Sequence, residues 1–295
     1  MSEPARPRLA ATVILVRDPA PADAGPCELF MVRRHGKSRF MANAHVFVGG
    51  RLDDADCGAA MAARCRGLTP TDAAMRLGVD DPAAALGLYV AAVRETFEES
   101  GVLIGETAEG TTPNPGRLRA LRDALHDGAH PFADLLQAEG LFLSLSRLRY
   151  LARWITPAIE PRRFDAYFFV CLVATDEHAS YDQRETTEGD WWSIEALLAA
   201  NGRAEILLPP PTLCTLEALQ ASTAADALVA RAADHPSAPV EPRALKGAPE
   251  PTLLLPDDHR YDDPASPAGR EHFFRFRDGH WVRHQGDVRT DVESD

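Results

Sequence analysis

The sequence lacks the patterns that mark several large classes of protein. Its five cysteines are an odd number, widely spaced and without a C-x-x-C pair, so we expect neither a disulfide framework nor a zinc site. No apolar run approaches the roughly 20 residues that cross a bilayer, and residues 1–8 lack the apolar region of a signal peptide. The last three residues, Glu293-Ser294-Asp295, differ from the S-K-L peroxisomal address. We therefore expect a protein of the reducing cytoplasm with no membrane partner.

Basic residues are also scarce. Lys and Arg number 31 against 44 Asp and Glu, which gives a net charge of −13. Because tight binding to nucleic-acid backbones depends on Lys and Arg neutralising phosphates, we expect no nucleic-acid partner. The apolar content of 45% and charged content of 25% are those of an ordinary globular protein. An acidic protein can still act on an acidic substrate if metal ions and a local basic patch offset the charge.

An acidic cluster occupies residues 94–102, which read R-E-T-F-E-E-S-G-V. Residues three and four apart share a helix face, so Glu95 lies beside Glu98 and Glu99, and such neighbouring carboxylates repel. Hard divalent cations prefer oxygen ligands, and Mg²⁺ is commonly shared between carboxylates and substrate phosphates. The cluster is therefore either a solvated acidic face or a metal platform for phosphate chemistry. We expect its helix over about 82–100, with Gly101 as the stop.

The cluster resembles the second half of the Nudix box, G-x5-E-x7-R-E-U-x-E-E-x-G-U, in which U is aliphatic. The matching residues are Arg94, Glu95, Glu98, Glu99, Gly101 and Val102. Residues 46–50, V-F-V-G-G, resemble the strand and glycine turn of the first half. The two halves lie about 30 residues farther apart than in the motif. Its first Glu has no clear counterpart, although Asp56 has the right spacing from Gly50.

A long insertion of this kind is similar to the branch of Nudix hydrolases typified by the mammalian peroxisomal coenzyme A diphosphatase. Further similarities lie at 154–157, 161–165 and 208–213, so the resemblance spans roughly 8–220. It implies an α/β fold, the Nudix α/β/α sandwich with a mixed sheet. We expect this domain over 1–235 and a linker with a C-terminal extension over 236–295. Asp278-Gly279 between apolar runs predicts a β-hairpin in that extension.

The insertion, about 57–82, has the composition of two short helices. Pro70 is typical of a first helical position, with Thr69 as the cap. The sequence leaves open whether these helices pack outside the core, form the surface of a homodimer or cover the substrate.

The resemblance implies a pyrophosphohydrolase that uses Mg²⁺ or Mn²⁺ and cleaves a nucleoside diphosphate linked to another moiety. Its metal ligands would be Glu95, Glu98, Glu99 and the carbonyl of Gly50, with Arg94 orienting the carboxylates. Glu95 or Glu185 would take a proton from the attacking water. Coenzyme A or acyl-CoA is the substrate that the branch implies. The alternatives are ADP-ribose, NADH, dinucleoside polyphosphates, or a module that binds a nucleotide without hydrolysing it.

Three further residues are candidates for binding substrate. Arg39 belongs to a basic segment before the glycine turn, which is either a phosphate-steering patch or a solvated loop. Arg163 would grip the pyrophosphate with its planar fork or pair with Asp165. Glu188, like Glu185, precedes a tryptophan where Nudix enzymes often place a loop carboxylate, and we prefer Glu185. We expect His126 and His130, which flank a turn, to face solvent.

Overall fold

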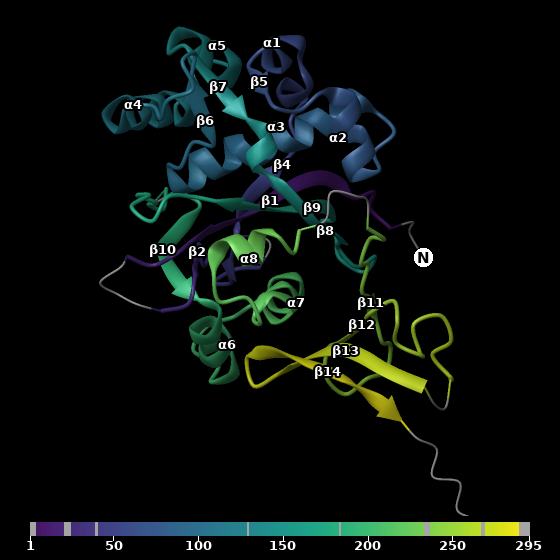
Figure 1. The fold of residues 1–295 in the computed structure, drawn as a ribbon. Coiled ribbons are helices and arrows are strands. Elements are labelled where there is room, and N and C mark those ends of the chain that lie inside the picture. Colours follow the sequence, from purple (N-terminus) through teal and green to yellow (C-terminus); the bar gives the residue numbers. More distant parts are fainter. Residues whose placement is uncertain are drawn as a thin grey trace, which may run out of the picture.

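The computed structural model describes residues 4–20, 25–38, 41–128, 130–182, 184–232, 237–266 and 269–288. A mixed seven-stranded sheet forms the middle of the molecule (Figure 1). Its main path runs β10 (Thr186–Ser193), β2 (Glu28–Arg34), β1 (Arg8–Arg17), β9 (Phe164–Leu172) and β8 (Arg149–Ile155), while β3 (His45–Val46) pairs with β2 and β4 (Val48–Arg51) with β1. Strands β1 and β9 are parallel, and the other pairs are antiparallel. The mixed sheet is therefore confirmed.

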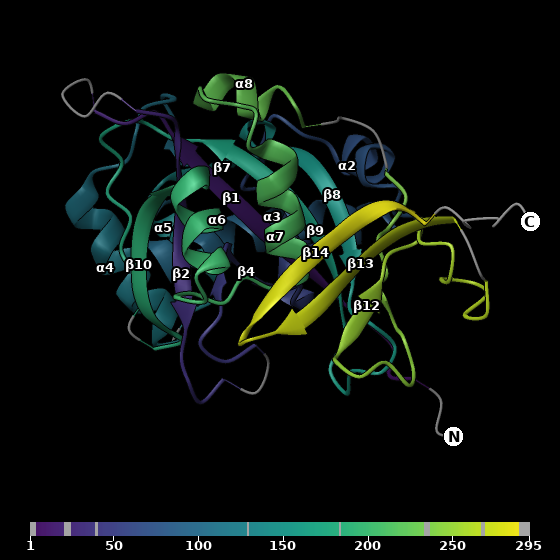
Figure 2. The same cartoon turned by 90° about the horizontal axis from the view of Figure 1, so that it is seen from below.

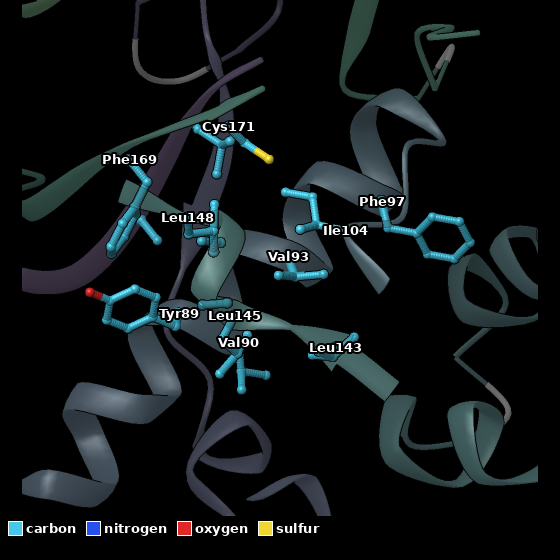
Figure 3. Packing of buried hydrophobic residues seen from close by; sticks show 14 of the residues in the cluster. Tyr89, Val90, Val93, Phe97, Ile104, Leu143, Leu145, Leu148, Phe169 and Cys171 are labelled. Carbon is cyan, nitrogen blue, oxygen red and sulfur yellow. The ribbon is translucent and has the colours of Figure 1, made fainter. Parts of the chain in front are cut away.

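Helix α3 (Pro82–Ser100) covers one face of this sheet. Its ends are set locally, because the side chain of Asp81 accepts from the amide of Ala83 and Gly101 adopts the left-handed conformation with φ 75°. Figure 3 shows Tyr89 and Val93 of α3 in the cluster that also contains Phe169 of β9. In the part of the chain that is described, no helix is long and apolar enough to cross a bilayer.

The opposite face of the sheet carries α6 (Ile194–Gly202), α7 (Pro210–Leu219) and α8 (Ala225–Val229), as Figure 2 shows. A second cluster of buried residues lies between these helices and the sheet, separate from the cluster beneath α3. The α/β/α sandwich predicted from the sequence is therefore confirmed.

The insertion packs on the main core. It contains α1 (Ala59–Ala62), β5 (Cys65–Arg66) and α2 (Pro70–Leu77), and η2 (Asp54–Cys57) leads into it. The predicted cap is present, because the hydroxyl of Thr69 accepts from the amide of Asp72. Met61 and Leu77 are buried in the same cluster as α3, so the insertion extends the core rather than standing apart from it. A homodimer formed through these helices stays a prediction.

A small sheet joins the insertion to the chain that follows α3, and the sequence pattern did not predict it. Strand β5 is parallel to β7 (Leu141–Ser144), which is antiparallel to β6 (Gly105–Thr107). These strands are two to four residues long, too short for an alternating pattern to be recognised. Helices α4 (Pro115–His126) and α5 (Phe132–Ala138) lie between β6 and β7, and η3 (Leu145–Arg147) follows β7.

The C-terminal extension is a four-stranded antiparallel sheet. Its strands are β11 (Arg243–Ala244), β12 (Thr252–Leu254), β13 (Gly269–Arg277) and β14 (His280–Val288). The predicted hairpin is present, and Asp278 and Gly279 turn with φ of 50° and 87°. The Pro-rich stretch over 235–251 that we expected as a linker contains β11, and β12 follows it directly; the division into a domain over 1–235 and an extension over 236–295 stays a prediction. Phe274 and Leu255 pack into the cluster of α6–α8, so this sheet shares that core (Figure 2).

Candidate active site

The backbone of the glycine turn packs directly against the acidic helix, with no room for a side chain between them. A methyl group on Gly50 would lie 2.2 Å from the carboxyl carbon of Glu95, and one on Gly49 would lie 2.3 Å from the carbonyl oxygen of Ala11 in β1. The amide of Gly49 donates to Oε2 of Glu99 at 2.9 Å. Only glycine leaves room for this approach. The two halves of the box are therefore brought together despite the insertion between them.

Arg94 holds the acidic side chains in place. Its Nε and Nη2 donate to the two carboxylate oxygens of Asp56, both at 2.9 Å. Its Nη1 donates to Glu95 at 2.9 Å and to Glu98 at 3.4 Å. The side chain of Asp56 is 3% exposed, so this pair is buried. Asp56, which has the spacing of the motif's first Glu, therefore serves as the main anchor of Arg94.

The carboxylates of Glu95, Glu98 and Glu99 in the Nudix box are buried with too little positive charge beside them to offset the burial. Burial raises the pKa of Glu95 to about 7, although Arg94 acts to lower it. Burial likewise raises the pKa of Glu98, against the same guanidinium. Glu99 is 6% exposed, and burial raises its pKa well above the ordinary value despite the hydrogen bond from Gly49. A cation placed among these carboxylates would favour their charged forms.

These carboxylates line a cavity of about 250 Å³. Its walls are Glu95, Glu98, Glu99, Leu125, His126, Asp182, Arg184 and Glu185. Asp182 organises the loop before β10, because it accepts from the amides of Glu185 at 3.1 Å and Thr186 at 3.0 Å. Burial acts to raise the pKa of Asp182, but these bonds and the hydroxyl of Thr186 lower it. The loop thus presents Glu185 to the cavity opposite the helix.

The family model of the NUDT19 Nudix domain matches residues 7–219 of this chain. The protein belongs to the Nudix hydrolases. It is 31% identical over 258 residues to the acyl-coenzyme A diphosphatase NUDT19 of Gallus gallus, covering 71% of this chain and 68% of that protein. The Homo sapiens protein of the same name is 28% identical over 251 residues, covering 70% and 67%. The chain thus spans about two thirds of the length of these relatives.

A solved structure extends the likeness to the fold. The NUDIX hydrolase from Alicyclobacillus acidocaldarius has a TM-score of 0.62 and 30% sequence identity, and the match covers 78% of this chain and 99% of that one.

Two of the predicted substrate residues lie away from the Nudix carboxylates. Glu188 pairs with Nη1 of Arg33 at 2.6 Å and lines a different cavity of about 290 Å³. Arg163 is 9% exposed, and its guanidinium donates to the carbonyls of Thr156 and Ala5, both at 2.9 Å, and to Glu241. These bonds give the guanidinium three partners within the protein, and a contact of Arg163 with substrate stays a prediction.

Asp165, the alternative partner that we weighed for Arg163, pairs with a different arginine. Asp165 accepts two hydrogen bonds from Arg153, both at 2.7 Å, because the two residues lie on the neighbouring strands β8 and β9. Arg39 lies outside the described residues.

The structure adds basic groups to the Nudix site that the sequence did not single out. The expectation that His126 faces solvent is wrong, because the half-buried ring lines the cavity and its Nε2 lies 3.1 Å from the carbonyl oxygen of Glu98. Arg184 donates to the carbonyl of His126 at 3.0 Å. His126 ends α4 and Arg184 precedes β10, so only the packing of these elements brings them to the box. No local pattern could have found them.

The donor set fits a hard divalent cation. Within the described residues, no three acidic, histidine or cysteine side chains form a ready-made cage for a metal ion. Arg94 and the amide of Gly49 take up carboxylate oxygens instead. Mg²⁺ does not need such a cage, because it keeps several waters and is commonly bound through one or two carboxylates together with substrate phosphates. The carbonyl of Gly50 and the crowded carboxylates offer oxygens of this kind.

Proposed function

We propose that this Nudix hydrolase cleaves the diphosphate bond of a nucleoside diphosphate linked to another moiety, with the help of Mg²⁺ or Mn²⁺. One observation carries the proposal. Three carboxylates line a single cavity together with Glu185; Arg94 holds those of Glu95 and Glu98, and the amide of Gly49 holds that of Glu99. Retention of all three box carboxylates also favours an enzyme over a module that only binds a nucleotide.

The metal would be held by Glu95, Glu98, Glu99 and the carbonyl of Gly50. When bound, it would neutralise charge on the diphosphate and make a nearby water more acidic. Nudix enzymes typically depend on divalent metal, and the raised pKa values of the three carboxylates support a cation among them.

The chain's own residues would position the reactants and move the proton. Arg94 keeps Glu95 and Glu98 aimed at the cavity. Glu185 or Glu95 takes the proton of the attacking water. His126 and Arg184 are the basic residues among those that line the cavity, so they would contact the phosphate oxygens. The oxygen of the water forms a bond to one phosphorus, the bond from that phosphorus to the bridging oxygen breaks, and the second phosphate leaves with the bridging oxygen.

The favoured substrate is coenzyme A or acyl-CoA, which would yield 3′,5′-ADP and phosphopantetheine or its acyl form. Support comes from the two relatives named acyl-coenzyme A diphosphatase and from the family match. ADP-ribose, NADH and dinucleoside polyphosphates are the alternatives, because the carboxylates indicate which bond is broken and not which moiety is attached to it.

All five cysteines are free, which supports the expected reducing cytoplasm.

A substrate panel tests the proposal. Coenzyme A, acyl-CoA, ADP-ribose, NADH and diadenosine tetraphosphate are incubated with Mg²⁺, with Mn²⁺ or with chelator, and the products are identified by mass. We expect metal-dependent cleavage that favours coenzyme A. Glu98→Gln should abolish most turnover with unchanged circular dichroism, whereas Glu195→Gln, the same change at an exposed helix position, should not. Preference for another substrate would refute the substrate alone, and metal binding without any cleavage would refute the enzyme.

A further inference from the structure

Arg122 of α4 caps the last turn of the acidic helix. Its Nε donates to the carbonyl of Glu98 at 2.8 Å, and its Nη2 donates to that of Glu99 at 2.9 Å. Carbonyls in the last turn of a helix have no partner within the helix, and a cation is favoured at that end of the helix dipole. The guanidinium therefore satisfies the backbone of two residues whose side chains face the cavity.

The same guanidinium holds the loop that carries Glu185. Its Nη1 donates to the hydroxyl of Ser180 at 2.9 Å, and Nη2 donates to the Ser180 carbonyl at 3.1 Å. The amide of Ser180 in turn donates to the carbonyl of Ser100, the last residue of α3, at 2.8 Å. Two residues farther along, Asp182 accepts from the amide of Glu185. Arg122 thus ties the end of α3 to Ser180, and two residues along the chain Asp182 holds the backbone of Glu185.

A second residue of α4 repeats the arrangement one turn later. His126 contacts the Glu98 carbonyl through its ring, and its own carbonyl accepts from Arg184 of the loop. Helix α4 therefore contacts both α3 and the loop before β10, once through Arg122 and once through His126. Arg119 of the same helix is exposed, so it offers a matched position away from this contact.

We propose that Arg122 is a positioning residue for hydrolysis, which sets how the carboxylates of α3 lie relative to Glu185. This inference rests on the proposed function, and in particular on a role for Glu185 in the reaction. The four hydrogen bonds of Arg122 come from a planar guanidinium with donors in fixed directions, which a lysine ammonium does not reproduce. Misplacement of a reacting group by about 1 Å can cost roughly 100-fold in rate. Loss of Arg122 should therefore lower kcat while the groups that bind substrate remain.

The first test compares Arg122→Gln and Arg122→Lys with Arg119→Gln on the substrate that the wild-type enzyme cleaves. We expect both Arg122 variants to lose about 10- to 100-fold in kcat with KM within a few-fold of wild type, and Arg119→Gln to match wild type. Hydrogen exchange should show faster exchange of the Glu185 and Thr186 amides in both Arg122 variants. If the Glu185 and Thr186 amides of the Arg122 variants exchanged as slowly as those of the wild type, the proposal would be overturned, even if kcat fell.

A double-mutant cycle then separates positioning from general stability. Arg122→Gln, Glu185→Gln and the double variant are compared by kcat and by thermal unfolding. If Arg122 acts through Glu185, its replacement should cost at least 10-fold in the wild-type background and less than 2-fold in the Glu185→Gln background. Equal losses in both backgrounds would overturn this inference and leave the proposed function standing. A wild-type enzyme that cleaves no member of the panel would overturn both.

Discussion

The buried pair between Asp56 and Arg94 should be the most sensitive point of the site. Asp56→Asn keeps the size of the side chain but removes its charge, and it turns an amide NH₂ group toward a guanidinium that has only donors. Breaking a buried ion pair from one side costs about 3–5 kcal/mol. Arg94 keeps its contacts with Glu95, Glu98 and the carbonyl of Arg51, so we expect the lower end of that range.

For a chain of 295 residues, a loss of about 3 kcal/mol corresponds to a fall in Tm of roughly 5 °C. Urea unfolding followed by circular dichroism measures the free energy of unfolding, and kcat should fall as well, because the same guanidinium holds Glu95 and Glu98. Asp53→Asn is the matched control. Asp53 lies 3.7 Å from Arg94 but its side chain is 51% exposed, so this change should cost less than about 1 kcal/mol. Equal effects of the two substitutions would refute the argument that burial gives Asp56 its importance.

Three further predictions concern the turn, the pH dependence and the C-terminal sheet. Gly50→Ala should lower kcat about 100-fold, because the methyl group would displace Glu95, whereas Gly202→Ala, with no atom within 4 Å of the new methyl, should leave kcat unchanged. In metal-free protein, the folded pKa of Glu95 of about 7 exceeds the ordinary value of 4.5, so the folded state binds more protons between these values. The contribution of Glu95 to the free energy of unfolding should then fall by on the order of 3 kcal/mol as pH rises from about 4.5 through 7, and urea titrations should show that Glu95→Gln reduces the slope, whereas the part due to Glu98 and Glu99 remains. Phe274→Ala, at a fully buried position, should cost about 3–5 kcal/mol in one cooperative transition, unlike Met75→Ala at a side chain that is 62% exposed. Two separate transitions would show instead that the C-terminal sheet folds independently.

The local elements of this protein could be predicted from neighbouring residues. Asp81 before Pro82, and Gly101 after the acidic run, mark both ends of α3 as the structure has them. Thr69 and Pro70 likewise begin α2, and Asp278-Gly279 turns the C-terminal hairpin. Each of these signals acts over three or four residues, through a cap, a fixed φ or a left-handed glycine. Such interactions are complete within the stretch of sequence that carries them.

By itself the sequence determined the class of protein, through the resemblance of residues 94–102 to the Nudix box. It also placed Glu95, Glu98 and Glu99 on one helix face, because they recur at helical spacing. Only the tertiary structure decided what surrounds them. Arg94 finds Asp56 across 38 positions, and Arg122 reaches Glu98 across 24. Arg163 donates a hydrogen bond to Glu241, 78 positions away. An arginine or a histidine carries no local mark of its partner, since that partner depends on which helices and strands pack together.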